Sequence, residues 1–260
     1  MNILEEIVAH KRKEVAAQKS LVSVADLMKK AAFTDECYPF ASFIRDPMRS
    51  GIIAEFKRKS PSKGWINQEA RVGMVTRGYT SFGASALSVL TDNHFFGGSL
   101  DDLEIARENQ IPILRKDFIV DDYQLLEAKA YGADVILLIA ACLDKQEVKD
   151  LSHTAKNLGL NVLLEIHSEA ELETICDTVD VVGINNRNLK TFQVDIAHSI
   201  RLASQLPDKC KISESGIDSP ETLKTLRSAG FEGFLIGEQF MKEKFPAVAF
   251  KNFLKSCNED

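Results

Sequence analysis

The stretch Val135-Ile-Leu-Leu-Ile-Ala140 is apolar at every position, and the charged Asp134 precedes it. A strand with one face in water alternates apolar and polar residues, whereas a strand that is covered on both faces is apolar throughout. The stretch therefore predicts a strand of a buried parallel sheet. Short runs of the same kind recur along the chain from residue 51, at 51–56, 84–90, 111–114, 134–139, 161–165, 179–184, 210–213 and 233–236.

Amphipathic stretches separate these runs and predict helices. Asp144 precedes one of them and Gly159 follows it, while Ser219-Pro220-Glu221 opens another with proline at the first helical position. The predicted helices cover 100–109, 121–131, 145–158, 170–178, 196–205 and 221–229.

A strand–helix unit repeated about eight times favours a parallel sheet that closes into a (β/α)8 TIM barrel. The alternative is an open, doubly wound sheet, which predicts a glycine-rich fingerprint after the first strand. The residues that follow the first strand are instead KRKSPSKG, 57–64. The length of 260 residues also suits a barrel.

The first 48 residues differ from the rest of the chain. Ile3, Ile7 and Val15 recur on one face of a charged helix, and a second short helix is expected from Val22 to Ala32 with Ser23 as its cap. This segment lacks the apolar mass for a core of its own. We expect one barrel domain over residues 1–260, in which residues 1–48 form a helical N-terminal extension.

Composition excludes several classes of function. The net charge of −6 disfavours nucleic acid as the main partner. The five cysteines are scattered and neither they nor the histidines have the spacing of metal ligands, so we expect reduced thiols and no metal. The N-terminus lacks the apolar core of a signal peptide, and no apolar run approaches the roughly 20 residues of a membrane helix. These features predict a cytoplasmic protein without membrane contact.

Charged side chains follow several of the predicted strands, where barrel enzymes place their active sites. Because side chains alternate along a strand, Ile53, Glu55 and Lys57 share one face, so both charged groups point into the barrel mouth if Ile53 packs inside. Further candidates end later strands: Lys116, Glu165, Asn185, Arg187 and Ser215. A single residue of this set could be an ordinary surface charge, but Glu165 lies among apolar residues and needs a partner there.

Two glycines follow the last two strands. Gly216 and Gly237-Glu238 could present backbone N–H groups to a phosphate, and Ser60 in the first loop could add a hydroxyl. The alternative interpretation is that the glycines only make tight turns.

The chain resembles the indole-3-glycerol-phosphate synthase family in a series of ordered motifs. They are EFKRKSPSKG at 55–64, SVLTD at 88–92 with FFGGS at 95–99, KDFI at 116–119, GINNR at 183–187 and SESGI at 213–217. Asn188 departs from the family, which often has Asp after Asn-x-Arg.

The resemblance implies a carboxy-lyase of tryptophan biosynthesis that needs no cofactor or metal. It would close the indole ring of 1-(2-carboxyphenylamino)-1-deoxyribulose 5-phosphate with loss of CO2 and water. Lys116 resembles the general acid, Glu165 the base for dehydration, and Lys57 beside Glu55 the group that binds the substrate carboxylate, with a role of Lys57 as an acid left open. Asn185 and Arg187 resemble residues that orient the substrate and Glu165, and Ser215 lies beside the reacting part. Ser60, Gly216, Gly237 and the N–H of Glu238 match phosphate contacts.

Apolar residues near the strand ends could hold the aromatic ring of this substrate. Phe118, Leu138 and Leu189 are the candidates, and plain core packing is the alternative for each. Two other functions are open: phosphoribosylanthranilate isomerase, which would need a Cys/Asp pair at strand ends, and a non-catalytic barrel that binds phosphorylated ligands. We expect a small phosphorylated molecule as the partner and a monomer.

Overall fold

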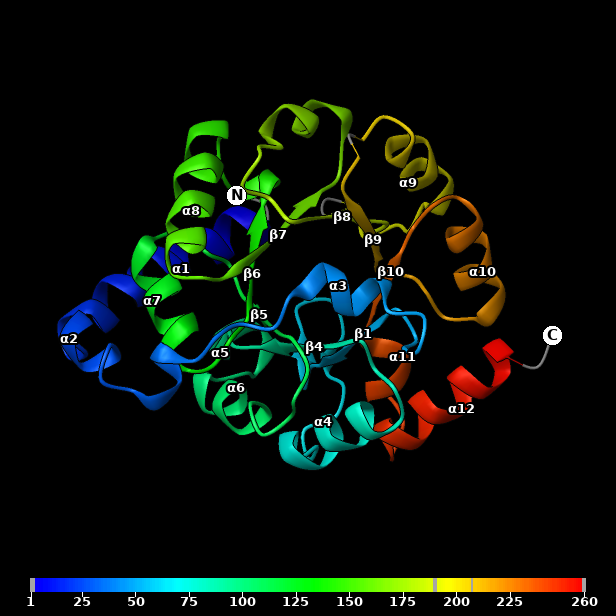
Figure 1. Cartoon of the computed structure of the whole chain (residues 1–260), viewed down its shortest axis with the longest axis horizontal. Coiled ribbons are helices and arrows are strands. Elements are labelled where there is room, and N and C mark those ends of the chain that lie inside the picture. Colours follow the sequence, from blue (N-terminus) through cyan, green and yellow to red (C-terminus); the bar gives the residue numbers. More distant parts are fainter. Residues whose placement is uncertain (1–2, 189–190, 207, 259–260) are drawn as a thin grey trace.

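The computed structural model describes residues 3–188, 191–206 and 208–258, and it contains a closed barrel of eight parallel strands (Figure 1). The strands are β1 (Ile52–Phe56), β4 (Ala86–Leu90), β5 (Ile113–Lys116), β6 (Val135–Ile139), β7 (Asn161–Ile166), β8 (Val181–Asn185), β9 (Cys210–Glu214) and β10 (Gly233–Ile236). Each pairs with its neighbour along the chain, and β1 pairs with both β4 and β10, which closes the barrel. The predicted (β/α)8 fold is confirmed, and every predicted strand overlaps an observed one.

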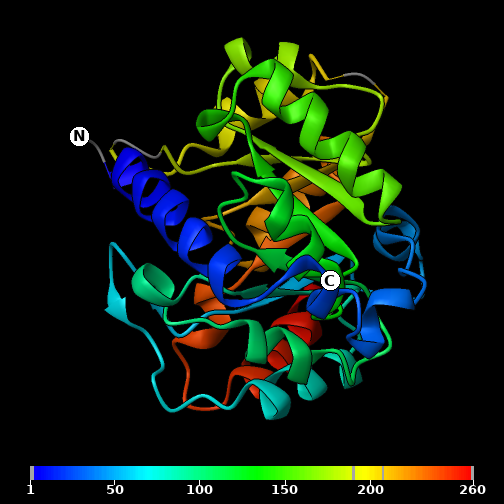
Figure 2. The ribbon, with the colours of Figure 1, turned by 90° about the vertical axis from the view of Figure 1, so that its left-hand side faces the viewer.

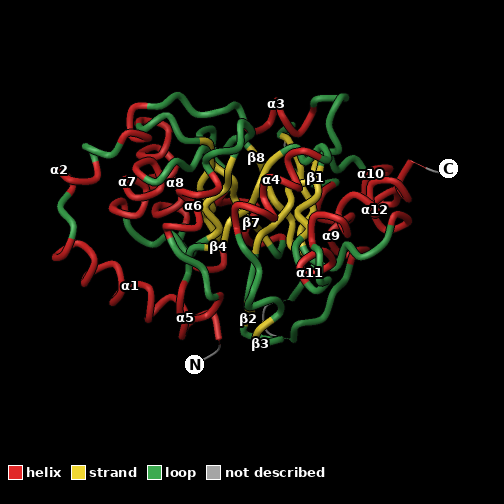
Figure 3. Tube along the Cα trace, turned by 90° about the horizontal axis from the view of Figure 1, so that it is seen from below, coloured by secondary structure: helices red, strands yellow, loops and turns green. Residues whose placement is uncertain are grey.

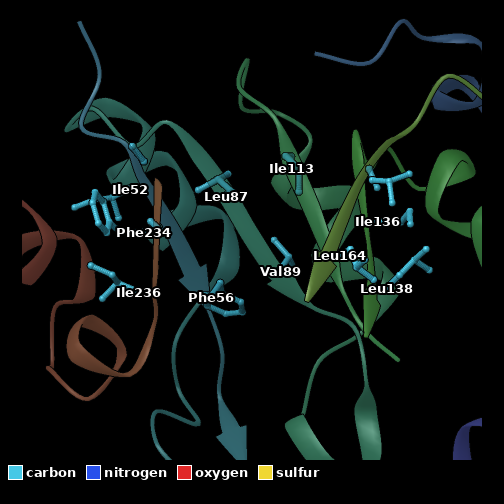
Figure 4. Packing of buried hydrophobic residues seen from close by; sticks show 14 of the residues in the cluster. Ile52, Phe56, Leu87, Val89, Ile113, Ile136, Leu138, Leu164, Phe234 and Ile236 are labelled. Carbon is cyan, nitrogen blue, oxygen red and sulfur yellow. The ribbon is translucent and has the colours of Figure 1, made fainter. Parts of the chain in front are cut away.

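Alternate residues of each strand enter two separate apolar layers. Ile53, Leu137 and Leu163 belong to the inner layer that fills the barrel. Ile52, Leu138 and Leu164 belong to the outer layer between the strands and the surrounding helices, part of which Figure 4 shows. Since both faces of the strands are covered, most strand residues are apolar, with Arg115, Lys211 and Ser213 as polar residues on the outward face. The inward face becomes polar toward the carboxyl ends of the strands, where Lys116, Glu165 and Glu214 lie.

Helices between the strands cover the outside of the barrel (Figures 1 and 3). The capping residues Ser23, Asp144 and Ser219 accept backbone N–H groups as predicted, Asp144 within a capping box. The helical elements are α1 (Ile3–Leu21), α2 (Val24–Leu27), η1 (Ala31–Thr34), α3 (Phe40–Arg45), α4 (Val72–Ser81), α5 (Asn93–Phe96), α6 (Leu100–Ala106), α7 (Asp122–Ala130), η2 (Ala140–Cys142), α8 (Lys145–Asn157), η3 (Glu169–Thr174), α9 (Ile196–Ala203), α10 (Pro220–Ser228), α11 (Glu238–Met241) and α12 (Pro246–Asn258).

Two predicted helices are shorter or tighter than expected. The expected helix over 22–32 is split into α2 and η1, and the expected helix over 170–178 is the 3-10 turn η3. In the second case Thr174, Ile175, Asp177 and Thr178 all have weak helix propensity, so the sequence after Glu173 does not sustain an α-helix.

The N-terminal segment touches both ends of the barrel. Phe40 and Ile44 of α3 join the inner apolar layer and plug the amino-terminal end. The helix α1 crosses the other end, which also carries the small hairpin of β2 (Lys59–Ser60) and β3 (Gly64–Trp65) (Figures 2 and 3). In the described part of the chain, no helix combines the length and apolar character required to cross a membrane.

Candidate active site

A cavity of about 450 Å³ opens at the carboxyl ends of the barrel strands. Twelve of the fourteen residues proposed from the sequence line it: Glu55, Lys57, Ser60, Lys116, Phe118, Glu165, Asn185, Arg187, Ser215, Gly216, Gly237 and Glu238. Leu189 lies outside the described residues.

The prediction that Leu138 contacts the substrate ring is wrong. Leu138 is fully buried in the outer apolar layer (Figure 4). It does not line the cavity, whereas its neighbour Ile139 does. Leu137 and Ile139 share the inward face of β6, so Leu138 must point toward the helices. The stretch 135–140 is apolar on both faces, and the sequence therefore carried no signal for which face is inward.

Glu55 and Lys57 extend the inward face of β1 beyond Ile53, as the alternation predicts. Lys57 Nζ lies 2.6 Å from Glu55 Oε1, and Ser88 Oγ lies 3.5 Å from Glu55 Oε2. A Cβ added at Gly237 would stand 2.4 Å from Glu55 Oε1. Glycine at position 237 therefore makes room for the carboxylate on the neighbouring strand, in addition to any contact with a ligand.

Lys116 and Glu165 face each other across the barrel mouth. Lys116 Nζ lies 3.5 Å from Glu165 Oε2, and Asn185 Nδ2 donates a hydrogen bond of 3.1 Å to Glu165 Oε1. The side chain of Asn185 is itself fixed, because its Oδ1 accepts the backbone N–H of Arg187.

The ionic contacts set the protonation of this pair. Burial opposes the charged form of Lys116, but the carboxylates of Glu165, Glu214 and Glu55 outweigh it and raise the pKa of the ammonium. Burial likewise opposes ionisation of Glu165, but Lys116, His167 and Asn185 hold its pKa well below the usual range. At neutral pH Lys116 is therefore a protonated ammonium and Glu165 an ionised carboxylate, and the two groups form an ion pair.

Glu214 is a cavity residue that was not among our candidates. It is buried at the end of β9, with Oε2 4.0 Å from Lys116 Nζ. A Cβ at Gly183 would stand 2.2 Å from Glu214 Oε1, so the glycine of β8 creates the space for this carboxyl group. Burial and the nearby charge of Glu165 raise the pKa of Glu214 to about 8. The signal was available, because Ile212 and Glu214 share one face of the strand.

The side of the cavity formed by the last two strands exposes backbone and small side chains. Ser215 adopts a left-handed conformation with φ 68°, which is uncommon outside glycine, and its carbonyl accepts a hydrogen bond from Asn186 Nδ2. Gly216 follows with φ 67°, and a Cβ there would stand 2.3 Å from Val194 Cγ1. Lys63 Nζ lies 3.4 Å from Glu238 Oε1, which draws the acidic side chain toward the first loop.

The opposite side of the cavity is apolar. Phe96 and Phe118 lie with ring centroids 6.0 Å apart, and Ile139 adds to the same wall. The N-terminal helix completes the wall with three side chains, Ile3, Leu4 and Ile7. The cavity thus has charged residues at its bottom, one polar side and one apolar side. This lining suits a substrate that carries anionic groups and an aromatic ring.

A buried lysine fixes the N-terminal helix over the cavity. Lys11 is fully buried, and its Nζ lies 2.8 Å from Asp92 Oδ2 and 3.0 Å from Asp117 Oδ1. Asp92 follows β4 and Asp117 follows Lys116, so this contact joins α1 to the loops that border the site. Sequence analysis missed the group because nothing local marks a lysine in a charged helix as buried.

A second ionic clamp holds the loop that carries Lys57 and Ser60. Arg58 Nη2 donates a hydrogen bond of 2.9 Å to Asp102 Oδ1, and Arg58 Nε donates a hydrogen bond to the carbonyl oxygen of Ala70. Trp65 packs against Gly97, where a Cβ would stand 3.0 Å from the indole ring. The first loop is therefore seated on α5 and α6 next to the cavity.

A closed parallel barrel with a paired acid and base at the carboxyl ends of its strands belongs to the class of (β/α)8-barrel enzymes. A solved structure of tryptophan synthase subunit alpha from Legionella pneumophila shares this fold, with a TM-score of 0.62 at 16% identity, over 84% of this chain and 95% of that one. Residues 4–253 match the family model described as indole-3-glycerol phosphate synthase, and the chain belongs to this family.

Relatives that bear this name cover nearly the whole chain. The indole-3-glycerol phosphate synthase of Bacteroides thetaiotaomicron is 51% identical over 98% of both chains. That of Neisseria meningitidis serogroup B is 43% identical over 93% of this chain and 95% of its own length. The family resemblance inferred from the sequence motifs is confirmed.

Proposed function

We propose that this protein converts 1-(2-carboxyphenylamino)-1-deoxyribulose 5-phosphate to indole-3-glycerol phosphate, as a carboxy-lyase of tryptophan biosynthesis. Family membership supports the reaction. The observation that carries the mechanism is the contact of 3.5 Å between Lys116 Nζ and Glu165 Oε2 inside a cavity with one charged and one apolar side.

Lys116 is the proposed general acid of ring closure. The aryl carbon that bears the carboxylate attacks the ribulose carbonyl carbon, and the ammonium gives its proton to the carbonyl oxygen as the C–C bond forms. Loss of CO2 then restores the aromatic ring. An acid of this kind, held at the reacting atom, contributes roughly 10²–10⁴-fold to the rate.

Glu165 is the proposed base of the dehydration that follows. The new hydroxyl leaves as water, and the proton that must leave with it passes to the Glu165 carboxylate. The depressed pKa of Glu165 keeps it ionised for this task at neutral pH.

The rest of the cavity orients the flexible substrate. Lys57, held by Glu55, is proposed to bind the substrate carboxylate, and Ser60, Gly216 and the backbone of Gly237-Glu238 to bind the phosphate. The reacting part of the substrate is proposed to lie beside Asn185, Arg187 and Ser215. Its aromatic ring is proposed to pack against Phe118, Phe96 and Ile139. Correct orientation of two reacting groups can supply up to about 7–11 kcal/mol of the barrier.

Turnover of the synthetic substrate tests the proposal directly. Purified protein mixed with the carboxyphenylamino-deoxyribulose phosphate should produce the absorbance and fluorescence of an indole. Formation of the carboxyphenylamino-deoxyribulose from phosphoribosylanthranilate would favour the isomerase instead. The described residues that line the cavity include no cysteine for that activity. Saturable binding without turnover would favour a non-catalytic barrel.

We propose further that the protein is a cytoplasmic monomer that acts on a small phosphorylated molecule. All five cysteines lie in the described residues and are free thiols, which suits a reducing compartment. The division into a barrel and a helical extension over residues 1–48 is also kept as a proposal, supported by the packing of α1 and α3 on the two barrel ends.

A further inference from the structure

His167 directly follows the end of β7 and contacts Glu165, which lines the cavity. Alternation places Glu165 and His167 on the same face, with Ile166 turned to the buried outer layer. The imidazole is only 12% exposed, and its Nε2 lies 3.1 Å from Glu165 Oε1. Neither ring nitrogen makes a hydrogen bond, so the contact is an ion pair when the ring is protonated.

Glu171 holds the other side of this imidazole. Its Oε2 accepts the backbone N–H of His167 at 2.6 Å and lies 3.7 Å from the ring Nδ1. The 3-10 turn η3 carries Glu171 and brings its carboxylate back to the end of β7. The main chain of His167 has one more support, because its carbonyl oxygen lies 3.0 Å from His198 Nε2.

These contacts form a row of alternating charge: Glu171, His167, Glu165 and Lys116. Glu165 Oε1 faces His167 and Asn185, while Oε2 faces Lys116. Two different oxygens are thus held by two different cations. Removal of His167 would leave Oε1 with a neutral amide, and the carboxylate could rotate away from the position opposite Lys116.

We propose that His167 is a positioning residue for the reaction, which holds the carboxylate of Glu165 through an imidazolium that Glu171 in turn supports. This inference rests on the proposed role of Glu165 as a base. His167 itself does not touch the reacting atoms, since it does not line the cavity.

Protonation of His167 follows from its neighbours. Burial favours the neutral ring, but Glu165 and Glu171 outweigh it and raise the pKa of His167 to about 10. The other charged group within this row, Lys116, is separated from the ring by Glu165. The imidazole therefore stays charged through the neutral range, and its support of Glu165 is constant there.

The test removes the positive charge at His167 with a side chain of similar size. His167→Gln should lower kcat about 10- to 100-fold with KM within about two-fold, the cost of a misplaced catalytic group. The acid limb of the kcat profile should also move to higher pH, because Glu165 loses one of its cations. His153→Gln, on the exposed side of α8, is the matched control and should leave both parameters unchanged.

A second readout does not depend on turnover. In spectra of ¹⁵N-labelled histidine, the His167 resonance, assigned by its loss in His167→Gln, should remain that of an imidazolium at pH 8. In Glu171→Gln its pKa should fall, with a smaller loss of kcat than in His167→Gln. If His167→Gln does not fold, the kcat of Glu171→Gln still carries the test, and wild-type kcat in that variant would contradict the proposal.

Two further results would overturn the inference: a neutral His167 at pH 7, or wild-type kcat and an unchanged pH profile in His167→Gln. Failure of the proposed function is a separate outcome, because it appears as absence of turnover in the wild-type protein, whereas the spectra report the ion pair in either case.

Discussion

Lys11 Nζ and Asp117 Oδ1 lie 3.0 Å apart, and both side chains are buried completely or nearly so although they are 106 positions apart in the chain. Asp117 is held on its other side by Thr91 and Arg115, which itself contacts Glu127. The N-terminal helix is thus tied to a buried ionic network that includes the residue next to Lys116. Through this network the helix α1, which borders the cavity, is linked to Lys116, the proposed general acid.

Lys11→Met should destabilise the protein and weaken substrate binding. It leaves Asp92 buried without the cation of Lys11 and leaves Asp117 with Arg115 alone, and breaking a buried pair in this way costs about 3–5 kcal/mol. The apolar side chains that α1 places on the cavity would also be lost, so KM should rise. Urea unfolding and steady-state kinetics measure the two effects. The control is Lys19→Met on the same helix, whose partly exposed pair with Asp121 should contribute less than about 1 kcal/mol. Equal losses in the two variants would show that Lys11 is no anchor.

Lys116→Ala and Glu165→Gln should block different steps of the reaction. Loss of the acid should lower kcat by roughly 10²–10⁴-fold and leave little intermediate. Loss of the base should instead let the condensed intermediate accumulate after CO2 has left. Quenched-flow analysis of intermediates, with CO2 release measured in parallel, separates the two cases. Near-wild-type turnover of Lys116→Ala would remove its assignment as the acid, and normal product formation by Glu165→Gln would remove that of the base.

The pKa of Glu214 predicts a pH dependence of stability. It is raised from 4.5 to about 8, so the folded protein binds more protons than the unfolded chain between these values. Its contribution is therefore complete below pH 4.5 and is lost as the pH rises through 8, with a slope of about 1.4 kcal/mol per pH unit between them. Glu214→Gln removes this slope, so the variant should gain stability relative to wild type as the pH rises. Urea unfolding from pH 5 to pH 8 measures the difference, and parallel curves for the two proteins would contradict the assignment.

The strand–helix rhythm of the chain was sufficient to favour the barrel, whose geometry brings the strand ends to one rim. The choice of Lys116 and Glu165 from the polar residues of that rim came from the family motifs, because spacing alone does not show which side chains meet. Glu214 could have been found by the same alternation, and His167 by its place two residues after Glu165. Lys11 could not, because its burial depends on carboxylates that lie 81 and 106 positions further along the chain.

The two faces of β6 give a last test, since the sequence alone could not tell them apart. Leu138 and Ile139 are both buried, but Leu138 packs under the helices and Ile139 lines the cavity. Leu138→Ala should cost about 2–5 kcal/mol of stability, the usual range for a large-to-small change in a core, and leave KM unchanged. Ile139→Ala should also lose stability, but it removes part of the cavity wall that we propose for the aromatic ring, so KM should rise several-fold. Unfolding curves with steady-state kinetics on both variants compare the faces directly. A rise in KM for Leu138→Ala alone would restore Leu138 as a ring contact and reverse the assignment of the two faces.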